Sequence, residues 1–150
     1  MSDDAVTADI TIDAPIEEVW ATCMDPDRLD QWVTIHKKLE SADGGSPRLG
    51  MKMKQTLVLR GASFKVDWQL TECEDEAHAV WEGRGPVRSY ARTEYHLTEN
   101  AQGGTDFHYV NEFKAPGGPL GKAASKALVG GLPQREADRS LAQLKALLEK

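Results

Sequence analysis

Hydroxyl and amide side chains recur within alternating apolar runs of this sequence. Thr93 and Tyr95 belong to one such run, and Tyr109 and Asn111 belong to the next. Successive residues of a β-strand point to opposite faces, so these polar groups share the face that carries the apolar residues. Burying an unpaired polar group costs about 1–3 kcal/mol, whereas small-molecule pockets combine apolar walls with a few polar groups. The pattern predicts a ligand-sized cavity, with a simple packed core as the alternative.

The predicted ligand-binding residues lie on inward strand positions and on the last helix. Trp68 and Trp81 fall on neighbouring strands, where their indole N–H groups either orient a ligand oxygen or belong to rings that only fill the core. Ser89 and Ala91 are small and leave room opposite the helix. The full predicted set is Met53, Gln55, Trp68, Trp81, Ser89, Thr93, Tyr95, Phe107, Tyr109, Asn111, Ala124 and Leu128.

Catalysis is not favoured by this set, because the inward strand positions hold no Asp, Glu, His, Lys or Arg. General acid–base chemistry needs a titratable group at the reacting atom. Tyr95 or Tyr109 could donate a proton, but a buried tyrosine hydroxyl more often only makes a hydrogen bond. We therefore expect no catalytic residue. The alternative is a cyclase or dehydratase in which Tyr95, Tyr109 or Asn111 polarises a carbonyl group.

Neither a metal nor a cofactor is expected. His36 falls on the outward side of its run and is interpreted as a lone surface histidine. His78, His96 and His108 fall in turns or on outward positions, and no two histidines have helical or hairpin spacing with a carboxylate that would suggest a metal site. Cys23 shares the buried stripe of the first helix and is expected to be inert. No phosphate-binding or nucleophile motif occurs.

Length and composition predict one domain over residues 1–150. The chain has 150 residues, 40% of them hydrophobic, which is enough for a substantial core. No window of about 18 consecutive apolar residues predicts a membrane span, and two distant cysteines suit a reducing compartment. A net charge of −6 without a basic stripe argues against nucleic acid. We expect a cytoplasmic monomer or homodimer whose partner is a small hydrophobic molecule.

The elements that must position these side chains follow from periodicity. Alternation predicts a strand over 6–12, helical spacing predicts short helices over 15–23 and from Asp25, and a second strand is expected over 33–40. Further alternating runs cover 51–59, 64–71, 79–82, 87–97 and 105–113. Short connections favour antiparallel pairing. The predicted class is α+β, a seven-stranded curved antiparallel sheet with two short helices and a long C-terminal helix over an apolar cavity. A Gly-Gly-Leu-Pro break at 130–133 predicts a kink or hinge in that helix.

The opening of the chain resembles a known superfamily. Residues 10–20, Ile-Thr-Ile-Asp-Ala-Pro-Ile-Glu-Glu-Val-Trp, are similar to the first strand and helix of START-like or polyketide cyclase/dehydrase (SRPBCC) proteins, and 25–32 resemble their second helix. The similarity covers roughly residues 8–148 and implies a helix-grip fold. Members bind sterols, lipids, polyketides or plant hormones, and a minority catalyse ring closure or dehydration. The resemblance implies binding or carriage of a lipid or a polyketide-like aromatic, without implying a reaction.

Three segments are similar to small actinobacterial members of that superfamily, some labelled as the toxin of a toxin–antitoxin pair. They are Trp-Val-Thr-Ile-His-Lys at 32–37, Gly83-x-Gly85 and Gly-Gly-Pro at 117–119. This resemblance implies a further alternative, a protein-interaction or toxin-like module.

Overall fold

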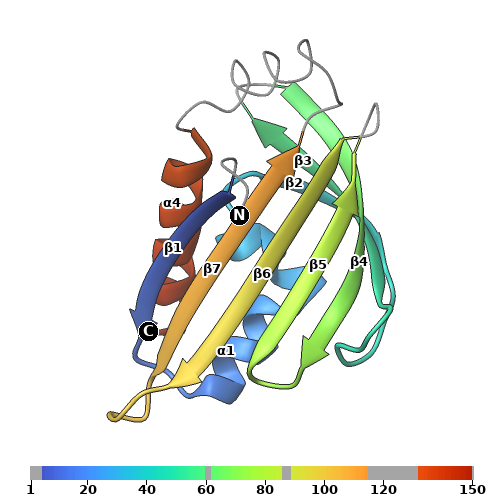
Figure 1. Ribbon diagram of the computed structural model, residues 1–150. Helices are drawn as coiled ribbons and strands as arrows, with labels where there is room; N and C mark the ends of the chain where they lie inside the picture. Colours follow the sequence, from blue (N-terminus) through green and yellow to red (C-terminus); the bar gives the residue numbers. More distant parts are fainter. Residues whose placement is uncertain (1–4, 60–61, 86–88, 115–131, 150) are drawn as a thin grey trace.

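A computed structural model describes residues 5–59, 62–85, 89–114 and 132–149. The strands form one seven-stranded sheet in the order β1-β7-β6-β5-β4-β3-β2, and all neighbours are antiparallel (Figure 1). The strands are β1 (Ala5–Ile12), β2 (His36–Ala42), β3 (Lys52–Leu59), β4 (Ala62–Glu74), β5 (His78–Arg84), β6 (Tyr90–Glu99) and β7 (Thr105–Lys114). The helices are α1 (Ile16–Cys23), the 3-10 turn η1 (Pro26–Arg28), α2 (Leu29–Trp32) and α4 (Leu132–Leu148). The predicted α+β class is confirmed.

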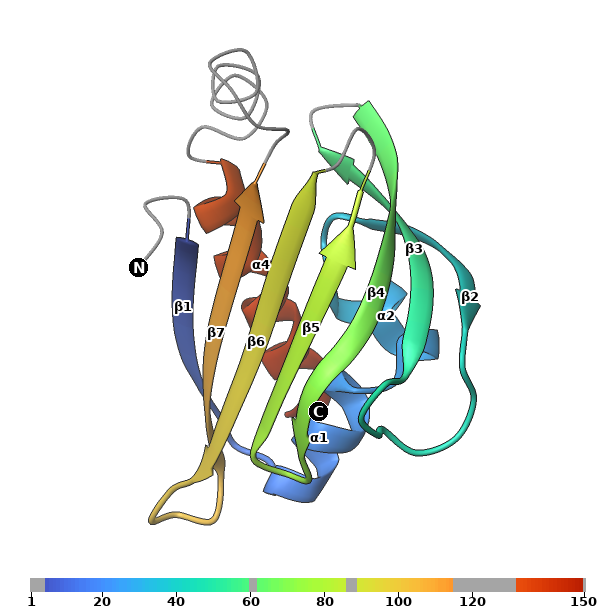
Figure 2. The same cartoon turned by 45° about the vertical axis from the view of Figure 1, so that its right-hand side comes forward.

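The sheet curves around the helices, which lie on its concave side (Figure 2). The helix α4 runs beside β1 and contacts α2, and it buries Ala137, Leu141 and Leu144. Alternation decides which strand residues join this core. Along β6, for example, Tyr95 and its inward neighbours are buried while the intervening residues stay partly exposed. None of the described helices has the length and apolarity to cross a bilayer.

The helix boundaries differ slightly from the periodicity. The helix α1 begins at Ile16, one residue later than predicted, because Pro15 keeps an extended backbone with ψ of 148°. The described part of α4 runs from Leu132 to Leu148 and includes Pro133. The predicted helical segment before Gly130, and with it the predicted kink or hinge, lies outside the described residues.

The prediction of a strand over 33–40 is wrong at its start. The amide of Val33 donates to the carbonyl of Leu29 at 2.9 Å and caps α2, and the amide of His36 donates to the carbonyl of Val33 at 3.1 Å. These bonds hold Val33 to Ile35 in a turn, so the strand begins only at His36. Its pairing with β3 then shifts register twice. Such irregularities break the strict alternation on which the outward placement of His36 depended.

Candidate functional site

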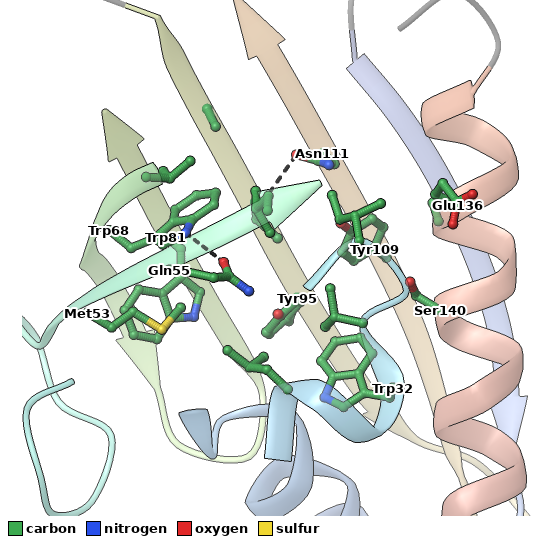
Figure 3. A pocket seen from close by; sticks show the side chains of 18 of the residues that line it. Trp32, Met53, Gln55, Trp68, Trp81, Tyr95, Tyr109, Asn111, Glu136 and Ser140 are labelled. Atoms are coloured by element: carbon green, nitrogen blue, oxygen red, sulfur yellow. Dashed lines mark hydrogen bonds between the residues drawn. The ribbon is translucent and has the colours of Figure 1, made fainter. Parts of the chain in front are cut away.

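A cavity of about 110 Å³ lies between the concave face of the sheet, α2 and the N-terminal half of α4. Figure 3 shows Trp68, Trp81 and Gln55 on one side, with Glu136 and Ser140 facing them from α4. The described lining is largely apolar and comes from most elements of the fold. It comprises Leu29, Trp32, Val33, Ile35, Met53, Gln55, Leu57, Phe64, Val66, Trp68, Trp81, Ala91, Thr93, Tyr95, Tyr109, Asn111, Glu136, Ala137 and Ser140.

The tryptophan wall depends on a glycine in the neighbouring strand. Gly83 on β5 pairs with Trp68 on β4. A Cβ atom at position 83 would lie 2.6 Å from Cγ1 of Val66 and 2.8 Å from Cε3 of Trp68. Both distances are too short for any β-carbon, so the absence of a side chain lets the indole of Trp68 lie over the strand. Gly83 thereby fixes one side of the cavity.

A chain of hydrogen bonds crosses the wall through Gln55. Its Oε1 accepts from Nε1 of Trp68 at 2.9 Å, and its Nε2 lies 2.8 Å from Nδ1 of His36. Because an amide nitrogen can only donate, Nδ1 of His36 accepts and its proton resides on Nε2. Burial lowers the pKa of His36, and the charge of Asp30 opposes that effect. A neutral imidazole is the form that this hydrogen bond requires.

The prediction that His36 is a lone surface histidine is therefore wrong. It is half-buried and orients Gln55, a predicted cavity residue. The sequence signal that could have found it is weak, because His36 lies between a turn and a register shift, where strand alternation does not hold.

Two tyrosines supply hydroxyl groups at the cavity. Tyr95 and Tyr109 pair across β6 and β7 with ring centroids 6.0 Å apart, and Tyr95 also lies 5.9 Å from Trp32. Burial raises the pKa of both, while a hydrogen bond with Asn111 partly opposes this for Tyr109. Beside them, Oγ1 of Thr93 donates to Oδ1 of Asn111 at 3.3 Å. Both phenols therefore stay protonated at neutral pH and can donate a hydrogen bond.

The helix α4 adds polar groups that the strand pattern missed. Oγ1 of Thr34 donates to Oε1 of Glu136 and lies 3.1 Å from Oγ of Ser140, which also accepts from the amide of Thr34 at 3.0 Å. Glu136 and Ser140 are four residues apart and so share one helix face. The sequence signal that could have identified them is their position next to Ala137 and Leu141, which belong to the apolar stripe of the helix. The prediction considered only the inward strand positions, and Glu136 brings a carboxylate to the lining from the helix.

The structure places most of the predicted ligand-binding residues around the cavity. Met53, Gln55, Trp68, Trp81, Thr93, Tyr95, Tyr109 and Asn111 line it. Two predicted residues are buried elsewhere: the hydroxyl of Ser89 is turned toward Gly85, and the ring of Phe107 packs 5.5 Å from that of Tyr95 in the core. Ala124 and Leu128 lie outside the described residues. Whether the lining residues contact a ligand stays a prediction.

The expectation about histidine spacing is also wrong. His78 and His96 face each other across β5 and β6, with Glu94 beside them on the outer face of the sheet. The two histidines pair across a hairpin whose register the sequence spacing did not reveal.

Solved structures of low sequence identity share this fold. CV1439 from Chromobacterium violaceum has a TM-score of 0.73 at 19% identity, over 98% of this chain and 99% of that chain. TTHA0849 from Thermus thermophilus has a TM-score of 0.73 at 18% identity, over 96% of each chain. DynU16, from the dynemicin biosynthetic locus, has a TM-score of 0.67 at 20% identity, and 99% of this chain matches 48% of that chain. At these identities the likeness shows the fold alone.

No curated protein matches the chain in sequence. A family model described as polyketide cyclase / dehydrase and lipid transport matches residues 4–149. The match spans nearly the whole chain and confirms the resemblance carried by the first strand and the short helices. This chain belongs to the polyketide cyclase/dehydrase and lipid transport family.

Proposed function

We propose that the protein binds a small hydrophobic molecule in the cavity between the sheet and α4, without transforming it. The observation that carries this proposal is the wall of Trp68, Trp81 and neighbouring apolar side chains, interrupted by fixed polar groups. Apolar walls with a few oriented donors are typical of small-molecule sites. The protonated hydroxyls of Tyr95 and Tyr109 would donate to a ligand carbonyl or hydroxyl oxygen.

The size of the cavity limits the size of the ligand that it can hold. Its volume is about 110 Å³, below the roughly 300–1,000 Å³ of sites for drug-sized molecules. An apolar cavity of about 150 Å³ in another protein is known to hold benzene. We therefore favour a single aromatic ring, or one ring of a polyketide-like aromatic, over a whole lipid. The rings of Trp68 and Trp81 would pack against it.

A cavity-filling variant tests the proposal. Purified protein is first extracted with organic solvent, and the extract is analysed by mass spectrometry for a co-purified ligand. The stripped protein is then titrated with N-phenyl-1-naphthylamine, an uncharged aromatic probe that fluoresces when bound. Ala91→Leu adds bulk inside the cavity, whereas Thr98→Leu adds it at an exposed position of the same strand.

We expect Ala91→Leu to weaken probe binding about tenfold or more, the scale of one lost hydrophobic contact of about 1.4 kcal/mol. Thr98→Leu should bind as the unaltered protein does. Equal affinity of all three proteins, together with an empty solvent extract, would refute binding in this cavity.

One observation favours a cyclase or dehydratase as the second candidate. Glu136 brings a carboxylate to the same cavity as Tyr109 and Asn111, and a titratable group is what general acid–base catalysis needs. The test offers linear aromatic-precursor polyketones to the protein and follows ring closure or loss of water. Turnover that Glu136→Gln and Tyr109→Phe abolish, with probe binding retained, would favour the enzyme.

We also propose that residues 1–150 act as one domain, as a monomer or homodimer in the cytoplasm. Light scattering coupled to size-exclusion chromatography measures the oligomeric state, and cell fractionation measures the location. The toxin-like alternative stays a prediction that growth arrest on expression would support.

A further inference from the structure

Three histidines form a row across the outer face of the sheet, away from the cavity. His78 on β5 is directly opposite His96 on β6, which is directly opposite His108 on β7. The rings of His78 and His96 are stacked, with centroids 4.6 Å apart and planes 20° apart, and His96 and His108 lie 5.8 Å apart. The proposed binding of a hydrophobic molecule uses none of them. Their alignment depends only on the register of β5, β6 and β7.

A carboxylate completes a donor set at one end of this row. Glu94 precedes His96 by two residues and shares its face, with Oε1 at 2.9 Å from Nε2 of His96. One ligand atom from each of His78, Glu94 and His96 lies within 4.8 Å of the other two. All three side chains are partly exposed, between 23% and 38%. An ion could reach them from solvent, and each can turn without disturbing the core.

The charges around the three side chains are mainly negative. Arg92 contacts the carboxylates of Glu94 at 3.1 Å, Glu82 at 3.5 Å and Glu72 at 3.7 Å. The carboxylates outnumber the single guanidinium among these contacts, so a cation is attracted to the group. Oε1 of Glu72 also lies 3.9 Å from Nε2 of His78, close enough for Glu72 to supply a further oxygen. Arg92 meanwhile holds the Glu94 carboxylate in place.

We propose that His78, Glu94 and His96 form a binding site for a late first-row divalent cation such as Zn²⁺, Cu²⁺ or Ni²⁺. Imidazole nitrogens select these ions, whereas Mg²⁺ and Ca²⁺ prefer oxygen ligands alone. Three protein ligands leave a fourth position for water or for the carboxylate of Glu72. The bound ion would link β5 to β6 on the face opposite the cavity.

The geometry needs only small side-chain movements to bind the ion. Zinc–nitrogen bonds of about 2.0–2.1 Å in a tetrahedral site place two ligand nitrogens about 3.3 Å apart. That spacing is within the 4.8 Å span of the present ligand atoms, and the β5–β6 ladder already fixes the two backbones. His96 would bind through the Nε2 atom that now faces Glu94, so its remaining proton must reside on Nδ1. The cation then takes the place of the proton between His96 and Glu94.

Isothermal titration of untagged, chelator-treated protein with Zn²⁺ tests the site, with Mg²⁺ as the comparison ion. The ligand variants are His78→Gln and His96→Gln, and the matched control is His108→Gln. His108 belongs to the same row but contacts Asp9 at 2.6 Å and is not one of the three proposed ligands. We expect the ligand variants to lose about tenfold or more in zinc affinity, at least the loss seen when groups supporting a metal ligand are removed. The control should keep its affinity, and Mg²⁺ should not bind.

A second measurement needs no variant and so does not depend on how the variants fold. The imidazole ¹⁵N resonances of the unaltered protein are followed as Zn²⁺ is added. We expect the nitrogen shifts of His78 and His96 to change, while those of His36 and His108 stay in place. Zinc binding that is equally strong in both ligand variants, changes confined to His36 or His108, or no binding of Zn²⁺ beyond that of Mg²⁺ would each overturn the proposal.

Discussion

The hydrogen-bond chain through Gln55 makes a definite prediction for Gln55→Leu. Gln55 and Trp68 are buried, at 4% and 7% exposure, and Oε1 of Gln55 accepts the indole proton at 2.9 Å. Leucine has a similar volume and suits the apolar neighbours on β3 and β4. The substitution therefore removes the hydrogen bonds of the amide while leaving little empty space.

The magnitude follows from the group that is left without a partner. A buried donor deprived of its acceptor costs about 1–3 kcal/mol, and the indole N–H of Trp68 is such a donor. His36 is only half-buried and can turn toward water. The loss of its hydrogen bond with Gln55 therefore costs less free energy. We expect the free energy of unfolding to fall by about 1–3 kcal/mol, which for a domain of this size lowers the Tm by about 2–4 °C per kcal/mol.

A double-mutant cycle separates this cause from general damage to the core. Urea unfolding, followed by circular dichroism, is measured for the unaltered protein, Gln55→Leu, Trp68→Phe and the double variant. Phenylalanine has no indole N–H, so Gln55→Leu should cost less in the Trp68→Phe background. We expect a coupling energy of about 0.5–3 kcal/mol. Effects that add within about 0.5 kcal/mol would refute the reasoning, and so would a Gln55→Leu variant that is more stable than the parent.

Three further outcomes follow from single features. Burial lowers the pKa of His36 from 6.5. As the pH falls below 6.5, the unfolded chain therefore binds the proton first and the free energy of unfolding decreases. Urea titrations should show that this free energy depends less steeply on pH in His36→Gln. Gly83→Ala places a Cβ 2.8 Å from Cε3 of Trp68 and should lower stability by about 1–3 kcal/mol, and a raised Tm would contradict this close approach. Cys23 is buried and burial raises the pKa of its thiol, whereas Cys73 is partly exposed. Iodoacetamide should therefore alkylate Cys73 in the folded protein while sparing Cys23, as peptide mass mapping would reveal, and equal rates would refute this.

Strand alternation predicted the cavity wall best where the ladders are regular. The pairing of β6 with β7 has no register shift, and Thr93, Tyr95, Tyr109 and Asn111 all lie where a period of two places them. Position along an alternating run did not distinguish cavity from core, however. Phe107 has the same parity as Tyr109 but is buried in the core against the ring of Tyr95.

The predictions were wrong where contacts between distant parts of the chain, and not the local sequence pattern, set the structure. The hydrogen bonds that end α2 delay β2, and the register shift between His36 and Lys38 then leaves His36 on the same face as Gln55. The row of histidines likewise could not be predicted from the local sequence pattern. His78 and His96 are neighbours only because β5 and β6 pair in one register, and a register one residue different would place them on opposite faces.

The structure also changes the reason for favouring binding over catalysis. The strand pattern argued from the absence of an acid, but Glu136 supplies one. Each of its two oxygens already has a partner, Oε1 the hydroxyl of Thr34 and Oε2 the guanidinium of Arg139 at 3.4 Å. The carboxylate therefore fastens α4 to the turn before β2. Burial raises the pKa of Tyr95 and Tyr109, so both hydroxyls keep the proton that they can donate. Because a hydroxyl donor can orient a ligand oxygen but acid–base catalysis also needs a group that removes a proton, the contacts already made by Glu136 support the proposal of binding that rests on the apolar wall.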